Sequence, residues 1–268
     1  MSTTDPFAEL KGRQREMWAS FAPTAMFTTA PAARLVKFAS VEPGDMVLDV
    51  GTGTGVVAIT AARAGARVTA IDLTPSLLDV ARENARIAGR SDIAWSEGDA
   101  ESLPVPDGMF DVVLSQFGHM FAPRPDIAVT EMRRVLKPGG RVAFATGPPE
   151  HFVGRLFAFI GRNSPPPPPG AQPPPSWGNP GIITERLAGQ FEAPFFSRAV
   201  MQFPALSLAH FREFMERSIG PMQKVIESFA HDPETLSRLR GEFEDLAAPY
   251  YADNIIRQEY LLTRAKAL

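Results

Sequence analysis

Short runs of consecutive apolar residues alternate with longer stretches of helical character up to about Thr146. Runs of this length that are rich in β-branched residues are typical of strands buried on both faces of a sheet. In chain order, the predicted strands are residues 47–50, 67–71, 93–96, 111–115 and 141–145. The alternation of strand and helix predicts an α/β fold with a doubly wound, mostly parallel sheet.

Helix signals lie between these runs. The segment VVAITAARA, which begins at Val56, has helical composition and spacing. Thr74 and Pro75 are typical of a helix cap and a first helical position, and Gly89 is typical of the residue that ends a helix. A further helix is predicted over residues 126–136. These segments supply crossover helices of the kind that parallel strands need.

The composition changes after Thr146. Residues 163–180 are rich in proline and contain the uninterrupted proline run 165–169. Such a run favours an extended polyproline II conformation and cannot pair inside a sheet. We interpret it as a stiff connector or the edge of a lid, rather than as a recognition motif for an aromatic groove.

Beyond this connector, the pattern again indicates helices and strands. Helix starts are expected at Asn179 and at Asp232, because each is followed by proline. A strand is predicted over residues 199–203 and an amphipathic helix over residues 207–219. The alternation in residues 259–266 predicts a last strand that returns at the edge of the sheet and completes it.

Three glycines follow the first predicted strand, in the segment VLDVGTGTG that ends at Gly55. Glycine at Gly51 and Gly53 removes the Cβ atoms that would keep a ligand from the backbone, and glycine tolerates positive φ. The next helix points its free N–H groups at this turn, which favours a carboxylate or phosphate. Asp72 ends the second strand, where an acid can accept hydrogen bonds from both ribose hydroxyls. The pattern therefore predicts a site for a ribose and an anion.

The dinucleotide-binding fingerprint requires one more glycine, directly after Gly55, where the helix packs closely on the strand. Val56 stands at that position. A nicotinamide-dependent dehydrogenase is therefore the less favoured interpretation of the same turn.

Four segments, in order, resemble those of the class I S-adenosylmethionine-dependent methyltransferases, and within them the quinone-biosynthesis-like small-molecule branch. The resemblance runs from about residue 41 to residue 146. The segments are VLDVGTGTG, VTAIDLTPSLL with Asp72, GDAESLPVPDGMFDVVLS with Asp99, and LKPGGRV at residues 136–142.

The resemblance implies S-adenosyl-L-methionine as the cofactor and assigns roles to residues of this chain. Asp72 would bind the ribose, Asp99 the adenine amine, and the N–H of Ala100 a ring nitrogen. Ser115 and Gln116 would lie beside the methionine portion. The full set of expected cofactor contacts is Asp49, Gly51, Thr52, Gly53, Gly55, Asp72, Leu73, Asp99, Ala100, Ser115 and Gln116.

By the same resemblance, the sheet should have seven strands, with the last strand antiparallel to the others, in a Rossmann-like methyltransferase fold. Residues 207–248 are the expected helical cover of a substrate site. Their aromatic and methionine side chains either line an apolar cavity or form plain core; they are Phe211, Phe214, Met215, Phe229 and Phe243. The N-terminal helix with Trp18 and Phe21 is a second candidate cover.

The implied reaction transfers a methyl group to an O, N or C atom of a small, apolar or aromatic metabolite. The cofactor brings the activation, so the protein chiefly binds, orients and excludes water. His119 is the candidate general base, because it follows the fourth strand near the expected methyl group. A structural role that holds the loop is the alternative for His119. For the whole chain, the alternative within the same fold is a cofactor-binding cyclase or isomerase.

Bulk properties agree with an enzyme of this kind. The chain has 268 residues, of which 44% are hydrophobic and 21% charged. A net charge of −3, from 27 basic and 30 acidic residues, provides no basic patch for nucleic acid. The chain has no cysteine, and its four histidines lack metal-ligand spacing, so we expect no metal site.

The N-terminus is polar and no segment approaches membrane-spanning length, so we expect a cytoplasmic enzyme without a membrane partner. The expected partner is a small-molecule substrate, and the sequence leaves the oligomeric state open. We divide the chain into an N-terminal helical cap (1–40), a cofactor-binding core (41–148) and a part with the proline-rich loop, the cover and the final strands (149–268).

Overall fold

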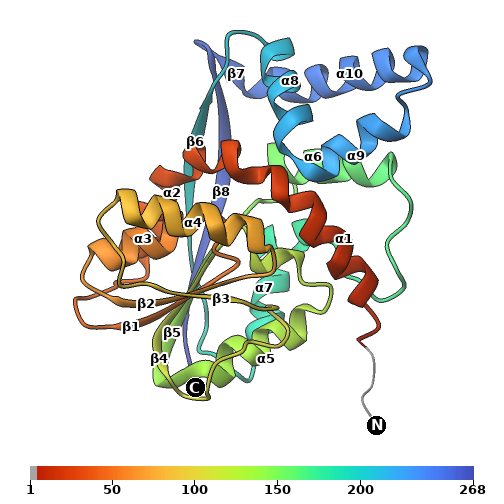
Figure 1. Ribbon diagram of the computed structural model, residues 1–268. Coiled ribbons are helices and arrows are strands. Elements are labelled where there is room, and N and C mark those ends of the chain that lie inside the picture. The colour runs from red at the N-terminus through yellow and green to blue at the C-terminus, as the bar shows by residue number, and fades with distance from the viewer. Residues whose placement is uncertain (1–4) are drawn as a thin grey trace.

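A single twisted sheet organises the computed structural model, which describes residues 5–268 (Figure 1). Its seven long strands lie in the order β3-β2-β1-β4-β5-β8-β6, and the short β7 pairs with β8. The strands are β1 (Met46–Val50), β2 (Arg67–Asp72), β3 (Ala94–Glu97), β4 (Phe110–Gln116), β5 (Leu136–Thr146), β6 (Phe195–Pro204), β7 (Tyr251–Ala252) and β8 (Ile255–Lys266).

Strand directions confirm the predicted sheet. Strands β1 to β5 pair in parallel, whereas β8 runs antiparallel to both β5 and β6. The expected edge position of the last strand is wrong, because β8 lies inside the sheet and β6 forms the edge. Burial explains the difference: Tyr260 to Thr263 are four consecutive buried residues, as in an interior strand, whereas β6 alternates between buried and exposed residues towards its end.

Helices cover both faces of the sheet. The helices are α1 (Ala8–Trp18), α2 (Thr29–Phe38), α3 (Val56–Arg63), α4 (Pro75–Ile87), α5 (Pro125–Val135), α6 (Phe152–Arg162), α7 (Pro180–Leu187), α8 (Leu208–Ser218), α9 (Gly220–Ser228) and α10 (Pro233–Ala247). Short 3₁₀ helices are η1 (Ala19–Thr28), η2 (His119–Phe121), η3 (Pro174–Gly178) and η4 (Ala248–Tyr250). In Figure 1, α2, α3 and α4 lie above the sheet and α5 lies below it, with α7 next to α5.

Successive strand residues enter two different apolar cores, one on each face. Val47 and Val112 pack with residues of α2 and α3, while Leu48 and Val113 pack with residues of α5 and α7. This arrangement follows from the two-residue periodicity of a strand and from apolar residues at every position. The continuous apolar runs of the sequence therefore correspond to a sheet buried on both sides.

Side-chain caps confirm the helix starts that were predicted after the proline-rich connector. Asn179 Oδ1 accepts from the N–H of Gly181 at 2.9 Å at the start of α7. Asp232 Oδ1 accepts from the N–H of Thr235 at 3.0 Å at the start of α10. These bonds satisfy N–H groups that lack partners within their helix.

Residues 207–248 form the helices α8, α9 and α10, which pack with α6 beyond the end of the sheet. In Figure 1, β6 and β8 extend upwards to reach this helical unit. Aromatic rings build its core: Phe211 lies 5.5 Å from Phe152 and 5.9 Å from Phe243, measured between ring centroids. The division of the chain into cap, core and cover stays a prediction, since its last part also supplies two strands of the sheet.

The proline-rich segment contains no strand, as expected, and its end is anchored on β5. Thr146 Oγ1 donates to the carbonyl of Trp177 at 2.7 Å, and the Trp177 ring is buried. The backbone of Gly178 lies so close to Gly147 and Pro148 that a Cβ atom would overlap them. Within the part of the chain that the structure describes, no helix is long and apolar enough to cross a membrane.

The close approach at Gly178 generates a stability prediction. We expect Gly178→Ala to lower the free energy of unfolding by about 1 to 3 kcal/mol, because the added methyl group forces packed backbone apart. The control is Gly161→Ala in α6, where nothing lies within 4 Å of a new Cβ. This control should be neutral or stabilising by up to about 1 kcal/mol. Urea unfolding measures both, and equal stabilities for the two variants would contradict the close packing.

Candidate functional site

The glycine turn after β1 has the backbone that its sequence predicts. Gly51, Gly53 and Gly55 have φ values of +69°, +55° and +83°. Gly51 also meets the turn after β4, because a Cβ at Gly51 would lie 2.7 Å from Cα of Gly118. A Cβ at Gly53, by contrast, would meet no atom of the described residues within 4 Å. The turn is therefore packed at its first glycine and open at its second.

Asp72, at the end of β2, holds the glycine turn in place. One carboxylate oxygen accepts from the N–H of Gly53 at 2.7 Å, and the other accepts from the N–H of Thr74 at 2.8 Å. The residue is only 8% exposed, and this burial raises the pKa of the carboxyl against the opposing effect of its hydrogen bonds. The acid thus joins the ends of two neighbouring strands.

Asp49 lies beneath the turn and is fully buried. Its Oδ2 accepts from Thr52 Oγ1 at 2.6 Å and from the N–H of Ala58 at 3.1 Å. Burial raises the pKa of Asp49 to about 7, and the nearby charge of Asp72 adds to this effect. Asp49 therefore ties the glycine turn to the first turn of α3.

One cavity extends from the glycine turn towards the helical cover. Eight of the residues that the sequence analysis expects at the site line this cavity: Gly51, Gly53, Asp72, Leu73, Asp99, Ala100, Gln116 and His119. Four further expected contacts do not line it: Asp49, Thr52, Gly55 and Ser115.

Local packing explains where these four residues lie. Gly55 makes room for Trp95, since a Cβ at Gly55 would lie 2.8 Å from that ring. Ser115 Oγ donates to the carbonyl of Val50 at 2.6 Å and accepts from the N–H of His119 at 3.0 Å. Asp49 and Thr52 bond to each other beneath the turn. Some residues of the sequence motifs therefore stabilise the fold around the cavity and do not line it.

His119 lies between two aromatic rings. Its ring centroid is 4.6 Å from that of Phe144 and 4.6 Å from that of Trp177. Neither ring nitrogen has a hydrogen-bond partner among residues 5–268, and burial lowers the pKa of His119 to about 3. A group with this pKa takes up a proton poorly near neutral pH. The base role of His119 stays a prediction, and this environment does not favour it.

Other lining residues come from elements that are distant in the sequence. They are Lys11, Gln14 and Trp18 of α1; Phe21, Thr24 and Thr28 of η1; Phe152, Leu156 and Phe157 of α6; Met201 and Phe203 of β6; and Gln258 of β8. Trp18 and Phe21 thus lie over the cavity, as the sequence analysis expects. No local pattern marks the residues from α6, β6 and β8, since only the tertiary fold brings them here.

The aromatic and methionine side chains of the cover take both of the roles that the sequence left open, which are cavity lining and core packing. Met215 lines the cavity, together with Ile219 at the end of α8. Phe211 and Phe243 instead form the buried core of the cover. The remaining two, Phe214 and Phe229, are partly buried and pack against that core.

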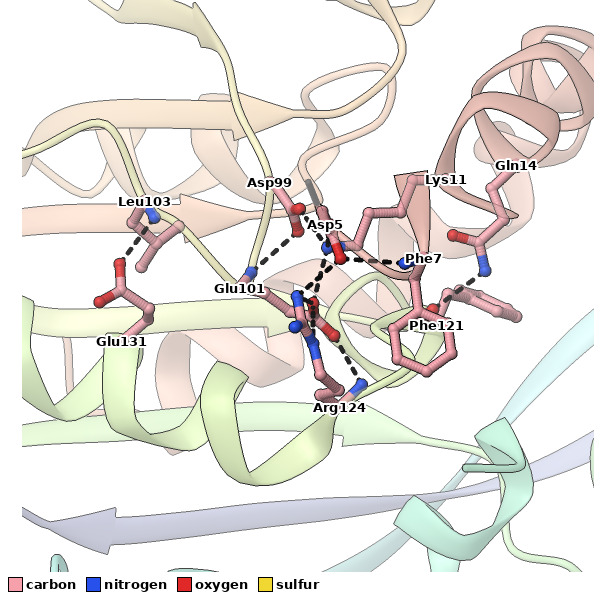
Figure 2. A network of polar contacts seen from close by, with 10 residues as sticks. All are labelled: Asp5, Phe7, Lys11, Gln14, Asp99, Glu101, Leu103, Phe121, Arg124 and Glu131. Carbon is pink, nitrogen blue, oxygen red and sulfur yellow. Dashed lines mark hydrogen bonds and ion pairs between the residues drawn. The ribbon is translucent and has the colours of Figure 1, made fainter. Parts of the chain in front are cut away.

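Asp99 enters the site from the loop after β3 and is paired with the N-terminal helix (Figure 2). Its Oδ1 accepts from the N–H of Glu101 at 2.9 Å, and its Oδ2 lies 2.6 Å from Lys11 Nζ. Among residues 5–268, one cluster of carboxylate side chains has a spacing that could hold a metal ion. It consists of Asp5, Asp99 and Glu101. The Lys11 ammonium contacts all three carboxylates and neutralises part of their charge.

Comparisons of the sequence place this site in a known context. A family model described as "Methyltransferase domain" matches residues 48–144. An uncharacterized protein of Mycobacterium tuberculosis is 36% identical over 261 residues, which is 94% of this chain and 93% of that protein. The ubiquinone/menaquinone biosynthesis C-methyltransferase UbiE of Rubrivivax gelatinosus is 38% identical over 108 residues, covering 40% of this chain and 41% of that protein.

Solved structures share the fold. Phosphoethanolamine N-methyltransferase 2 of Haemonchus contortus, in complex with S-adenosyl-L-methionine, has a TM-score of 0.56 at 19% identity, covering 88% of this chain and 52% of that one. The [4+2]-cyclase SpnF has a TM-score of 0.53 at 23% identity, covering 87% of this chain and 80% of that one.

The chain belongs to the class I S-adenosylmethionine-dependent methyltransferases, and its cofactor is S-adenosylmethionine. This confirms the family resemblance, the fold and the cofactor inferred from the four motifs. The dehydrogenase alternative is set aside, in agreement with Val56 after the glycine turn.

The buried imidazole generates a prediction on pH and stability. In the unfolded chain His119 takes up a proton near pH 6.5, whereas in the folded chain its pKa is about 3. Lowering the pH from 7.5 to 5 should therefore cost the wild type about 2 kcal/mol more than His119→Leu, measured by urea unfolding at both pH values. Asp49 contributes a slope of opposite sign, but it does so in both proteins.

A suitable control for this comparison is His231→Gln, which changes an exposed histidine. The control should keep the pH dependence of the wild type. If the wild type and His119→Leu show the same dependence, then His119 is not held neutral in the folded state.

The position of Asp72 beside the glycine turn generates a prediction on cofactor binding. We expect Asp72→Ala to weaken S-adenosylhomocysteine binding by about 1 to 3 kcal/mol, because ribose hydroxyls and the N–H of Gly53 lose their acceptor. Titration calorimetry measures the dissociation constant, and circular dichroism checks that the variant is folded. The control is Asp79→Ala, which removes an exposed acid of α4. An unchanged dissociation constant for Asp72→Ala would contradict the assignment.

Proposed function

We propose that this enzyme methylates an O, N or C atom of a small, uncharged, apolar or aromatic molecule. The observation that carries the proposal is the composition of the cavity. Among residues 5–268, the ionised side chains that line it are Lys11, Asp72 and Asp99. All three lie at the end near the glycine turn and the loop after β3. The remainder is lined mostly by aromatic, methionine and aliphatic side chains, together with uncharged polar side chains, which are Gln14, Thr24, Thr28, Gln116 and Gln258.

Physical chemistry relates this lining to the substrate. An ion that is buried without a partner costs several kcal/mol, and the apolar end of the cavity offers no counter-charge among the described residues. Apolar and aromatic surface is favoured there, at roughly 25 cal/mol for each Å² removed from water. A neutral, largely apolar acceptor therefore matches this end of the cavity.

The polar end fits the cofactor. Gly53 leaves open space where a side chain would stand, so its backbone can approach the amino-acid part of the cofactor. In our assignment, Asp72 accepts from the ribose hydroxyls, Asp99 from the adenine amine, and Ala100 donates to the adenine ring. Gln116, whose Nε2 donates to the carbonyl of Thr28 at 3.0 Å, also lines the cavity.

The cofactor supplies a methyl group on a sulfonium, which is already activated for displacement. The residues of this chain contribute binding, orientation and the exclusion of water. Phe121, Phe157 and Met215 enclose the acceptor side, and the neutral His119 adds no charge there. Proton transfer by His119 stays a prediction, as do the cytoplasmic location and the absence of a nucleic-acid partner.

The test is turnover with paired acceptors that differ only in charge, such as a phenol and its carboxylated counterpart, followed by release of S-adenosylhomocysteine. We expect measurable turnover for neutral members and at least about 100-fold lower kcat/KM for charged ones. A preference for charged acceptors would contradict the proposal. Consumption of an acceptor without release of S-adenosylhomocysteine would instead identify the cyclase or isomerase alternative.

The lining of the cover provides a matched pair of variants for the same assay. Met215→Ala should raise KM for the acceptor and leave the affinity for S-adenosylhomocysteine unchanged, because Met215 lines the cavity from α8. Leu206→Ala is the control, since Leu206 is 76% exposed just before that helix. If Met215→Ala has no effect on KM for any accepted substrate, then the substrate does not occupy this part of the cavity.

A further inference from the structure

The N-terminal helix α1 lies over the cavity, where polar contacts act together with the packing of Trp18 on Phe121, whose ring centroids are 4.6 Å apart. Lys11 is the only residue of α1 that is buried, and Gln14 and Trp18 also line the cavity. Gln14 Nε2 donates to the carbonyl of Phe121 at 3.0 Å, and Arg15 pairs with Glu97 at the end of β3. A helix without fully buried apolar residues gains limited free energy from hydrophobic burial. The position of α1 therefore depends on its polar contacts as well as on the packing of Trp18.

Lys11 makes three of these polar contacts through a single nitrogen atom. Its Nζ lies 2.6 Å from carboxylate oxygens of Asp5, Asp99 and Glu101. An ammonium group has three N–H donors, so each carboxylate can receive one of them. In Figure 2, the three acids point towards Lys11 from two separate parts of the chain. The contact between Lys11 and Glu101 spans 90 residues of sequence.

Arg124 supports the same cluster from the far side of Glu101. Its Nε and Nη2 donate to Glu101 Oε2 at 2.8 and 2.6 Å, and its backbone N–H donates to Oε1 at 2.5 Å. Arg124 Nη2 also reaches Asp5 at 3.1 Å. The Glu101 side chain is 1% exposed, so it depends on Lys11 and Arg124 to balance its buried charge. Removing Lys11 therefore leaves Glu101 partly compensated by Arg124.

The bonds to Asp99 leave it able to bind a ligand. One of its oxygens accepts from the N–H of Glu101 and the other from Lys11. A carboxylate has about four lone-pair positions, so acceptor capacity remains after these two bonds. An ionised carboxylate accepts but does not donate. It can therefore pair with the 6-amino group of adenine, whereas it repels the 6-oxo group of a hypoxanthine.

We propose that Lys11 is a positioning residue for the cofactor, which orients the Asp99 carboxylate towards the adenine and couples the seating of α1 to cofactor binding. The inference rests on the assignment of Asp99 to the adenine amine in the proposed function. It follows that the N-terminal helix contributes to the affinity for the cofactor and to the selection of its base. By linkage, cofactor binding must stabilise α1 in this position to the same extent.

The experiment compares the wild type with Lys11→Met, Lys11→Arg and Arg13→Met by titration calorimetry. The probes are S-adenosylhomocysteine and its 6-oxo counterpart, S-inosylhomocysteine. Lys11→Met should bind S-adenosylhomocysteine about 5- to 150-fold more weakly and discriminate less between the two probes. Lys11→Arg should recover part of both effects. Arg13→Met should match the wild type, because Arg13 pairs with Glu9 on the exposed face of the same helix.

Hydrogen exchange tests the coupling directly. In the wild type, amides of residues 8–18 should gain protection when S-adenosylhomocysteine is added, and this gain should be smaller in Lys11→Met. A purely structural lysine would change stability without changing the ratio of the two probe affinities. If Lys11→Met fails to fold, Asp5→Asn serves instead. It removes one of the three carboxylates around Lys11 without altering Asp99, and a smaller change in the same direction is expected.

Three results distinguish a failure of this inference from a failure of the proposed function. The inference would be overturned if the Lys11→Met variant bound S-adenosylhomocysteine as tightly as the wild type, or more tightly. An unchanged preference for the 6-amino probe would overturn it as well. Both results leave the proposed function intact, whereas a wild-type chain that fails to bind S-adenosylhomocysteine would overturn the proposed function itself.

Discussion

The close contact between two turns at the carboxyl ends of β1 and β4 is the constraint on which the site depends. Gly51 and Gly118 approach so closely that a Cβ on either residue would lie within 3 Å of the other backbone. Ser115 reinforces the contact, because its hydroxyl joins the carbonyl of Val50 to the N–H of His119. In the proposed assignment, one turn would bear the cofactor and the other would face the acceptor, so their separation would set the geometry of transfer.

Two different physical interactions complete the enclosure around this centre. The helical cover is held by aromatic packing among Phe152, Phe211 and Phe243. Ion pairs also join α8 to α10, between Arg212 and Glu244 and between Arg240 and Glu216. The N-terminal helix is held by ion pairs centred on Lys11 and Glu101. Removing one partner from such an ion-pair cluster leaves the remaining buried charges only partly compensated, whereas apolar contacts weaken in proportion to buried area. The two walls of the cavity therefore differ in their balance of apolar and ionic contacts.

Much of the fold was predictable because its signals are local. Strand length, β-branched content, proline at helix starts and glycine in tight turns each depend on a few neighbouring residues. The interior position of β8 was not predicted, since pairing partners depend on the whole sheet. In the same way, Asp49, Gly55 and Ser115 belong to recognisable motifs, but their side chains or packing contacts point away from the cavity.

The sequence by itself determined the α/β class and the glycine turn with its acid at Asp72, because these rest on short-range backbone requirements. The cofactor followed from the resemblance of four sequence motifs to a known family. Only the tertiary structure decided which motif residues face the cavity, the neutral state of His119 and the meeting of Lys11 with Asp99. The physical reason is that burial and charge pairing depend on groups far apart in the chain. No local pattern specifies which distant side chain will supply the missing partner.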